Sequence, residues 1–284
     1  GLHFAPDPSS QQSCSIGGNV ANNSGGPHCL AEGVTSAHVL GCDVVLSDGT
    51  LVRFGGEEPE HPGFDLRGAF VGSEGMFGIA TAICIRLTPN PPDVRTMLLD
   101  FSSVRDGTDT VSTIIAAGMV PAALEMMDRL CLEAVEAYVH AGLPTDAAAA
   151  LLVELAGPSA AVAADAERVR EIGEQHGARS VRVARDEAER ALLWKGRKNA
   201  FGAIARIKPN YYLHDTVVPR RHLSEVLEHV YRIVASHGLQ VLNVFHAGDG
   251  NLHPLLIFDR REPGVVERVH AAGAEIVEVS VRYG

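Results

Sequence analysis

Glycine is distributed unevenly along this 284-residue chain, and that distribution constrains the fold more than any other feature. Fifteen of the 29 glycines lie in residues 1–78. Because glycine loses more backbone entropy on folding than any other residue, such a density indicates tight turns or close approach to a ligand. A proline run at 89–92 follows, and proline continues neither a central strand nor a helix. We therefore expect two domains, residues 1–92 and 93–284.

Local patterns predict mixed helix and strand structure in both parts. In the first part we expect a hairpin of strands 38–46 and 50–54 joined by an Asp-Gly turn, a short helix at 65–70 and a buried strand at 79–87. In the second part we expect strands at 95–101, 122–126, 151–155, 180–184, 211–217, 241–245 and 252–258. Between them we expect helices at 104–117, 128–141, 160–176, 186–205, 223–236 and 263–281. This alternation predicts an α+β fold with helices on one face of a largely antiparallel sheet.

Charge and composition exclude several classes of protein. The net charge is −11 and no basic run occurs, so nucleic acid is not an expected partner. No segment is long and apolar enough to predict a transmembrane helix. The five cysteines form no CxxC pair, which predicts free thiols in a reducing, cytoplasmic compartment. Isolated histidines such as His38, His61 and His140 are expected at the surface or in the core.

Two glycine-rich segments are the first candidates for a binding site. Residues 16–26 read IGGNVANNSGG and residues 72–78 read GSEGMFG. Bare backbone at such positions can approach a flat or anionic ligand and aim N–H groups at it. The second segment is a GxxGxxG that precedes a strand, so it does not predict a Rossmann fold, and no phosphate-binding GK[ST] motif occurs. Purely structural turns explain the glycines equally well.

The segment NVFHAGDGNLHPLLIF at 243–258 predicts a second candidate site. A type I′ turn centred on Asp249 and Gly250 would place His246 directly opposite His253, with Cβ atoms roughly 5 Å apart. Two imidazoles at that separation can chelate one divalent cation. The alternative is a polar hairpin with two hydrogen-bonded histidines.

A basic cluster, WKGRK at 194–198, lies on a predicted helix. Arg197 could bind a substrate carboxylate through both arms of its guanidinium. The alternative is a helix face in solvent.

Five segments together resemble one protein family: residues 6–28, 66–81, 123–129, 193–203 and 243–254. They are similar to the FAD-linked oxidases of the glycolate oxidase subunit and D-lactate dehydrogenase type, within the vanillyl-alcohol-oxidase-type flavoprotein superfamily. The resemblance implies the C-terminal half of an FAD-binding domain at 1–92. It implies an incomplete substrate domain, a ferredoxin-like antiparallel sheet with helices, at 93–284. By resemblance the chain is an internal fragment, and the pyrophosphate loop and a Gly-Glu-His-Gly segment are expected outside it.

The resemblance implies FAD and a divalent metal, zinc or similar, as cofactors. By position, the residues lining the isoalloxazine and ribityl region would be Pro6, Ile16, Gly17, Gly18, Asn22, Gly25 and Gly26. Those closing around the rest of FAD would be Glu74, Gly75, Gly78 and Ile79, and His28 is a further neighbour. His246 and His253 look like metal ligands, with the third ligand and the catalytic base coming from the Gly-Glu-His-Gly segment.

The implied reaction is metal-assisted oxidation of a small D-2-hydroxy acid to the 2-keto acid. Arg197, His246 and His253 would act on the substrate, and electrons would pass to a non-oxygen acceptor, an iron–sulfur partner subunit or a quinone. Residues 211–219 lack the lysine of the 2-hydroxyglutarate enzymes, and Leu255 stands where those have asparagine, which favours glycolate or D-lactate. Peripheral membrane attachment through a partner and an oligomeric assembly are compatible with this function.

Two other functions are weighed against this one. A non-catalytic fragment or assembly subunit would explain the lack of the two missing motifs, and the fragment alone is expected to be inactive. Metal-dependent hydrolysis at the hairpin is disfavoured because no glutamate stands beside His246 or His253 in the sequence.

Overall fold

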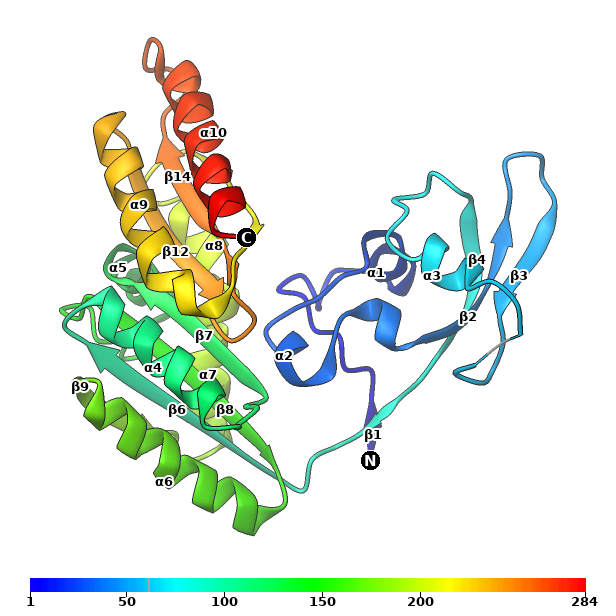
Figure 1. Ribbon diagram of the computed structural model, residues 1–284, viewed down its shortest axis with the longest axis horizontal. Coiled ribbons are helices and arrows are strands. Elements are labelled where there is room, and N and C mark those ends of the chain that lie inside the picture. Colours follow the sequence, from blue (N-terminus) through cyan, green and yellow to red (C-terminus); the bar gives the residue numbers. More distant parts are fainter. Residues whose placement is uncertain (61) are drawn as a thin grey trace. The chain divides into compact units, whose positions relative to one another are not determined.

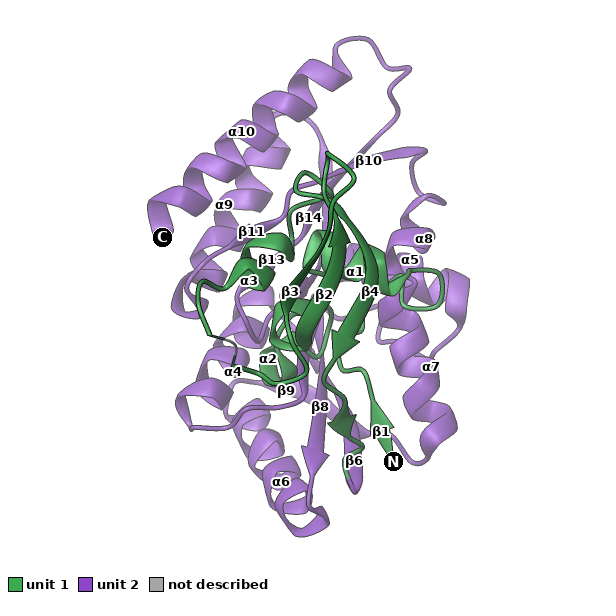
Figure 2. Cartoon of the chain, turned by 90° about the vertical axis from the view of Figure 1, so that its right-hand side faces the viewer, with its two compact units in different colours: residues 1–91 green, residues 92–284 purple. Residues whose placement is uncertain are grey.

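The computed structural model describes residues 1–60 and 62–284, which form two compact units, residues 1–91 and 92–284 (Figure 2). His61 lies outside the described residues. None of the described helices is both long and apolar enough to cross a bilayer. The assignment of the two units to a flavin domain and a substrate domain stays a prediction.

Unit 1 is built on a small antiparallel sheet. The order is β3-β2-β4, with bounds β2 Val39–Val45, β3 Leu51–Gly55 and β4 Ile79–Ile85 (Figure 1). Two short strands, β1 Leu2–His3 and β5 Thr88–Pro89, pair with each other. The helical segments are α1 Ile16–Asn22, α2 Cys29–Glu32, η1 Thr35–Ala37 and α3 Leu66–Phe70. The Asp-Gly hairpin of β2 and β3 is confirmed.

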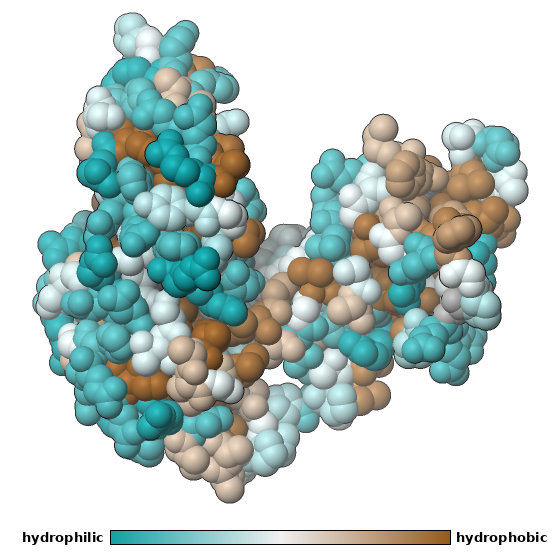
Figure 3. All heavy atoms as spheres, viewed as in Figure 1, coloured by the Kyte–Doolittle hydropathy of each residue, from teal (hydrophilic) through white to brown (hydrophobic). Residues whose placement is uncertain are grey.

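Unit 1 contains a helix that the sequence patterns do not predict and a strand whose burial they predict wrongly. The first glycine segment begins with α1, and the Ser15 hydroxyl accepts a hydrogen bond from Gly18 N at 3.0 Å and caps the helix. Strand β4, predicted to be buried, is largely exposed, with Ile79 at 70%. Among the described residues β4 is an edge strand that pairs only with β2, and Figure 3 shows hydrophobic surface on this part of the unit.

Unit 2 is a nine-stranded antiparallel sheet. Its main order is β10-β14-β12-β7-β8-β6-β9, with β13 joined to β12 and β11. The strands are β6 Asp93–Phe101, β7 Ala123–Asp128, β8 Ala149–Gly157, β9 Ala178–Val183, β10 Asn210–Leu213, β11 Thr216–Val217, β12 Gln240–His246, β13 Asn251–Leu252 and β14 Pro254–Phe258. The run β7-β8-β6-β9 has the strand order of a ferredoxin-like fold, as the family resemblance implies.

Helices cover both faces of this sheet, whereas the sequence predicts one (Figures 1 and 2). One face carries α4 Val104–Ala116, α6 Ser159–Gln175, α9 Leu223–Ser236 and α10 Val265–Tyr283, with the short η2 Arg220–His222. The other face carries α5 Arg129–Val139, α7 Glu187–Lys198 and α8 Ala200–Ile204. Nearly every residue of the central strands β7 and β8 is therefore buried. A strand covered on both sides needs apolar residues at consecutive positions. It therefore lacks the alternation of apolar and polar residues that marks a sheet with one face in solvent.

Three predicted elements are divided in the structure. The helix expected at 186–205 breaks at Asn199, whose side-chain amide donates to the Lys195 carbonyl at 2.8 Å and so competes with the helical backbone. The strand expected at 211–217 divides into β10 and β11, and the one expected at 252–258 divides into β13 and β14 with His253 between them.

Helix α10 packs closely on the residues that follow β10. A Cβ atom added at Gly273 would overlap the imidazole of His214, which is buried beneath the helix and contacts Tyr212 edge-on. We expect Gly273→Ala to destabilise the protein by about 1–3 kcal/mol, since overpacking forces the ring to shift.

Urea unfolding, followed by the fluorescence of Trp194, the one tryptophan of the sequence, measures this effect. The matched control is Gly202→Ala in α8, where a Cβ meets nothing within 4 Å, so that variant should be unchanged or slightly more stable. Equal stabilities of the two variants would contradict the close packing of α10 on His214.

Asp128 caps α5 and lies on the α9 face of the sheet. Its carboxylate accepts from Cys131 N, from both nitrogens of Asn243 and from the Tyr231 hydroxyl at 2.8–3.1 Å. Burial nevertheless raises the pKa of Asp128 to about 6, despite these hydrogen bonds. The folded state therefore binds a proton more tightly than the unfolded state.

This raised pKa predicts that stability decreases as pH rises. The contribution of Asp128 is fully present below its unfolded pKa and is lost as pH rises through about 6. Relative to Asp128→Asn, which cannot titrate, the wild type should lose about 2 kcal/mol between about pH 4.5 and pH 7.5. Urea unfolding of both proteins across this range gives the difference, and a difference that does not change with pH would be evidence against the raised pKa.

Candidate functional site

The histidine hairpin has a different register from the one predicted. Residues 247–250 form a four-residue turn, and His246 pairs with Asn251 across the strands, not with His253. The longer turn displaces the register by two residues, so each histidine keeps its predicted face of the sheet but the two occupy diagonal positions. The expected direct opposition is wrong.

The two imidazoles nevertheless lie close together. Their ring centroids are 5.0 Å apart in an edge-to-face arrangement. Burial and the neighbouring His246 lower the pKa of His253 to about 4, so His253 is neutral at neutral pH. His253 Nε2 lies 3.6 Å from Asp215 Oδ2, and its buried Nδ1 has no hydrogen-bond partner among the described residues.

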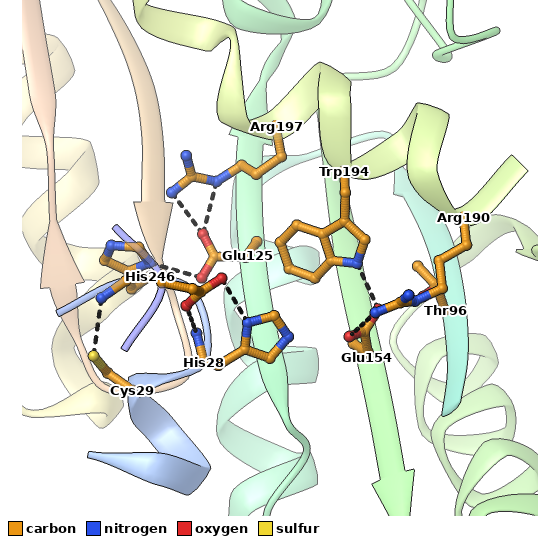
Figure 4. Close-up of polar contacts among 11 residues, drawn as sticks. His28, Cys29, Thr96, Glu125, Glu154, Arg190, Trp194, Arg197 and His246 are labelled. Carbon is orange, nitrogen blue, oxygen red and sulfur yellow. Dashed lines mark hydrogen bonds and ion pairs between the residues drawn. The ribbon is translucent and has the colours of Figure 1, made fainter. Parts of the chain in front are cut away.

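Glu125 on β7 joins the hairpin to the rest of the site (Figure 4). It stands directly opposite His246 in the register of β7 and β12, and its Oε1 lies 2.7 Å from His246 Nδ1. Burial opposes the ionisation of Glu125, but the charges of Arg197 and His246 outweigh burial and lower the pKa of its carboxyl. Burial likewise opposes protonation of His246, yet Glu125 raises the pKa of that imidazole. These directions describe an ionised carboxylate that holds a proton on Nδ1.

Arg197 is buried, with 1% of its surface exposed, so the alternative of a solvated helix face is wrong at this position. Its Nε donates to Glu125 Oε2 at 2.7 Å and its Nη2 lies 2.6 Å from the same oxygen. Nη1 is buried and has no hydrogen-bond partner in the described part of the chain. The structure therefore brings Arg197 and His246 together on one carboxylate, with the imidazole of His253 against that of His246.

A second buried carboxylate fixes the helix that carries Arg197. Glu154 on β8 accepts two hydrogen bonds from Arg190 at 2.9 Å, one from Trp194 Nε1 at 2.5 Å and one from Thr96 at 2.6 Å. Arg190, Trp194 and Arg197 stand at i, i+4 and i+7 of α7, which places them on the same helix face (Figure 4). α7 is thus held against the sheet at two charged points.

Glu125 and Glu154 were not recognised in the sequence as functional candidates. The signal that could have identified them is a single acidic residue inside an otherwise apolar strand, LEMM at 124–127 and VELA at 153–156. Such a carboxylate must be paired when buried. The expectation that no glutamate lies beside the histidines holds for the sequence but is wrong for the fold. Glu125 contacts His246, although it also binds Arg197.

The donor set of the hairpin fits a metal ion in part. His246 has one ring nitrogen on a carboxylate, Glu125, as metal-binding histidines usually do, which leaves its Nε2 as a ligand atom. His253 Nε2 lies 3.6 Å from Asp215, beyond hydrogen-bonding distance, and its Nδ1 has no partner among the described residues. Within residues 1–60 and 62–284 no group of three or more metal-binding side chains occurs, so the hairpin offers two candidate ligands.

The two glycine segments of unit 1 lie side by side. Gly72 N donates to the Val20 carbonyl and Glu74 N donates to the Ala21 carbonyl, both at 2.8 Å, so the second segment lies along α1. Of the predicted cofactor residues, Pro6 is buried, and those with half-buried backbone are Gly17, Gly18, Gly25, Gly26 and Gly78. The exposed ones are Ile16, Asn22, Glu74, Gly75 and Ile79.

Close packing within the protein explains several of these glycines. A Cβ at Gly26 would overlap the Asp7 backbone, one at Gly25 would lie 2.7 Å from Cys29 Sγ, and one at Gly78 would lie 2.6 Å from Val44. At Gly17 a Cβ would meet nothing within 4 Å, so protein packing does not require glycine there. Gly75 also has space for a Cβ, but its φ of +80° favours glycine. Turns and close packing, without any ligand, therefore explain part of the glycines in the two segments.

Unpartnered polar atoms in both segments fit a hydrogen-bonding ligand such as FAD. Asn19 Oδ1 in the first segment and Ser73 Oγ in the second are buried without a hydrogen-bond partner among the described residues. Neither residue was predicted. His28, expected as a neighbour of the cofactor, lies 2.9 Å from Asp7 Oδ2 through its Nδ1 (Figure 4).

Comparison with known families finds matches in both parts of the chain. Residues 90–284 match the family described as FAD linked oxidases, C-terminal domain, and residues 1–55 match the FAD binding domain. The chain belongs to the FAD-linked oxidase family. The predicted resemblance is confirmed, and FAD is the cofactor of this family.

Several curated relatives are similar along the whole chain. The glycolate oxidase subunit GlcD of Escherichia coli is 50% identical over 283 residues, which cover 100% of this chain and 57% of that protein. GlcD of Bacillus subtilis is 41% identical, with 100% and 61% covered. A probable mitochondrial D-lactate dehydrogenase of Danio rerio is 30% identical, with 95% and 55% covered. The chain thus spans just over half the length of these relatives.

Solved structures confirm the fold class. p-Cresol methylhydroxylase with substrate bound superimposes with a TM-score of 0.77 at 17% identity, covering 98% of this chain and 62% of that one. 4-Ethylphenol oxidase from Gulosibacter chungangensis gives 0.75 at 20% identity, covering 99% and 62%. At these identities the likeness shows the fold alone.

The docking of α7 leads to a prediction about stability. Glu154→Ala should destabilise the protein by about 3 kcal/mol or more, because it leaves Arg190 and the Trp194 indole without their buried acceptor. Glu187→Ala removes an exposed partner of the same Arg190 at 2.8 Å and should cost less than about 1 kcal/mol. Urea unfolding compares the two variants, and equal losses would show that Glu154 does not anchor α7.

Proposed function

We propose that this chain is part of an FAD-dependent enzyme that oxidises a small D-2-hydroxy acid, of the glycolate or D-lactate type, to the 2-keto acid. One observation carries the proposal: a buried arginine with an unpartnered Nη1 lies beside a pair of histidines, in a chain of the FAD-linked oxidase family. Relatives named glycolate oxidase subunit GlcD and D-lactate dehydrogenase support this substrate class.

Arg197 would bind the carboxylate of the substrate. Glu125 occupies Nε and Nη2 on one side of the guanidinium, so Nη1 is the donor that would remain for a second anion. A buried charge–charge contact of this kind fixes the orientation of a small substrate, which has few other groups to hold.

His246 and His253 would hold the divalent metal, and residues 16–26 and 72–79 would hold FAD. When bound, FAD accepts the hydride and the metal favours loss of the hydroxyl proton. The neutral state of His253 leaves its nitrogen lone pair available as a ligand. Glu125 keeps the proton of His246 on Nδ1, away from the ligand side of the ring.

The surroundings favour a substrate with one carboxylate. Leu255, at the position where the 2-hydroxyglutarate enzymes have asparagine, is completely buried among apolar side chains such as Leu242. It offers no donor to a second carboxylate. Electrons would leave the flavin for a non-oxygen acceptor, an iron–sulfur partner subunit or a quinone, and such an acceptor would bring the protein to a membrane surface through its partner.

Anaerobic mixing of the complete gene product with 2-hydroxy acids tests this proposal. We expect glycolate or D-lactate to bleach the absorption of oxidised flavin, and D-2-hydroxyglutarate to do so far more slowly. Arg197→Lys keeps the charge but loses the planar fork, so kcat/KM should fall about 100-fold or more. Flavin that stays oxidised with every 2-hydroxy acid would overturn the proposal.

A further inference from the structure

We propose that Glu125 is a positioning residue of this site, which orients both His246 and Arg197 toward their ligands. The inference rests on the proposed function, because it assigns a role relative to the metal and the substrate. Glu125 would touch neither of them, and would act only through the two side chains that it binds.

Burial and register show that Glu125 is held rigidly. It is completely buried in the central strand β7, with His246 of β12 directly opposite and Leu152 of β8 on its other side. Its two oxygens have different partners: Oε1 faces His246 Nδ1 at 2.7 Å and Oε2 takes both Nε and Nη2 of Arg197. Loss of either contact would leave a buried charged group without its partner.

The contact to His246 determines which ring nitrogen is free. The carboxylate of Glu125 is paired with the guanidinium of Arg197 and therefore only accepts hydrogen bonds, so the nitrogen that faces it, Nδ1, carries the proton and Nε2 is presented to the ligand. Without the carboxylate, either nitrogen could carry the proton and the ring could turn over. Ordering of the histidine tautomer by a carboxylate is a general means of raising metal affinity.

The contact to Arg197 determines which arm of the guanidinium is free. Because Nε and Nη2 are both on Glu125 Oε2, the plane of the fork is fixed and Nη1 points away from the carboxylate (Figure 4). The carboxylate of Glu125 therefore leaves Nη1 of Arg197 for the substrate and Nε2 of His246 for the metal. A change at Glu125 should disturb both, which a purely structural ion pair would not do.

Glu154 provides a matched control. It is also almost fully buried, lies on the neighbouring strand β8, faces the same side of the sheet and binds an arginine of the same helix, Arg190. Glu154 binds an indole and a hydroxyl group besides its arginine, whereas Glu125 binds a histidine. Replacing each glutamate by glutamine removes one buried charge from an otherwise similar environment.

Equilibrium dialysis of Zn²⁺ and Co²⁺ against the complete gene product measures the metal half of the role. Glu125→Gln should weaken metal binding about 10- to 100-fold, while Glu154→Gln should change it less than about threefold. Steady-state kinetics measure the substrate half. Glu125→Gln should raise KM more than Glu154→Gln does, because the glutamine at 154 keeps an acceptor for Trp194 and Thr96 and its arginine does not bind the substrate. Equal effects of the two variants would overturn the positioning role.

Two further variants separate failure of this inference from failure of the proposed function. If His253→Ala abolishes metal binding and Glu125→Gln does not weaken it, the metal site stands and the role of Glu125 is wrong. If neither His246→Ala nor His253→Ala affects metal binding, the metal site itself is wrong, and the positioning role falls with it.

A measurement on the wild type applies even if Glu125→Gln fails to fold. In ¹⁵N-histidine-labelled, Zn²⁺-loaded protein, the resonances of His246 can be assigned from their loss in His246→Gln. A protonated Nδ1 with metal on Nε2 supports the role of Glu125, and a protonated Nε2 with metal on Nδ1 overturns it.

Discussion

Buried carboxylates on one face of the central sheet control the architecture of the larger unit. Glu125 and Glu154 are taken fully out of water, and an unpaired buried carboxylate costs several kcal/mol, so each must be matched by a cation or a donor. Both find an arginine on α7, and this pairing brings the helix to the sheet at a defined height and rotation. The position of Arg197 is a consequence of that pairing, since its side chain has almost no contact with solvent.

The need to pair the buried carboxylate of Glu125 also explains the position of the histidine hairpin. The arginine satisfies Oε2 of Glu125, and the other oxygen lies opposite the end of β12, where only a donor can stand. His246 meets that requirement, and the four-residue turn that follows returns His253 to the same face. The proposed site for an anionic substrate and a cation thus lies at the edge of a charged network that also stabilises the fold. In unit 1, by contrast, close packing alone accounts for Gly25, Gly26 and Gly78.

Much of this could be predicted from the sequence, because local patterns reported local structure well. The alternation of helices and strands in unit 2 is confirmed, and so are the Asp-Gly hairpin of β2 and β3 and the family resemblance. The failures concern contacts between distant segments. Glu125 and His246 are 121 positions apart, so no spacing rule connects them. The exposure of β4 depends on which strands pair with it, which periodicity does not reveal. The register of the hairpin depends on turn length, and Asp-Gly suggested a two-residue turn where four residues are used.

A crystal structure of the complete gene product with a bound 2-keto acid tests the account most directly. We predict that the product carboxylate lies within hydrogen-bonding distance of Arg197 Nη1, with the keto oxygen beside His246 and His253, while Glu125 keeps its bonds to Arg197 and His246. A product whose carboxylate is held elsewhere, with Arg197 bound to Glu125 alone, would contradict it.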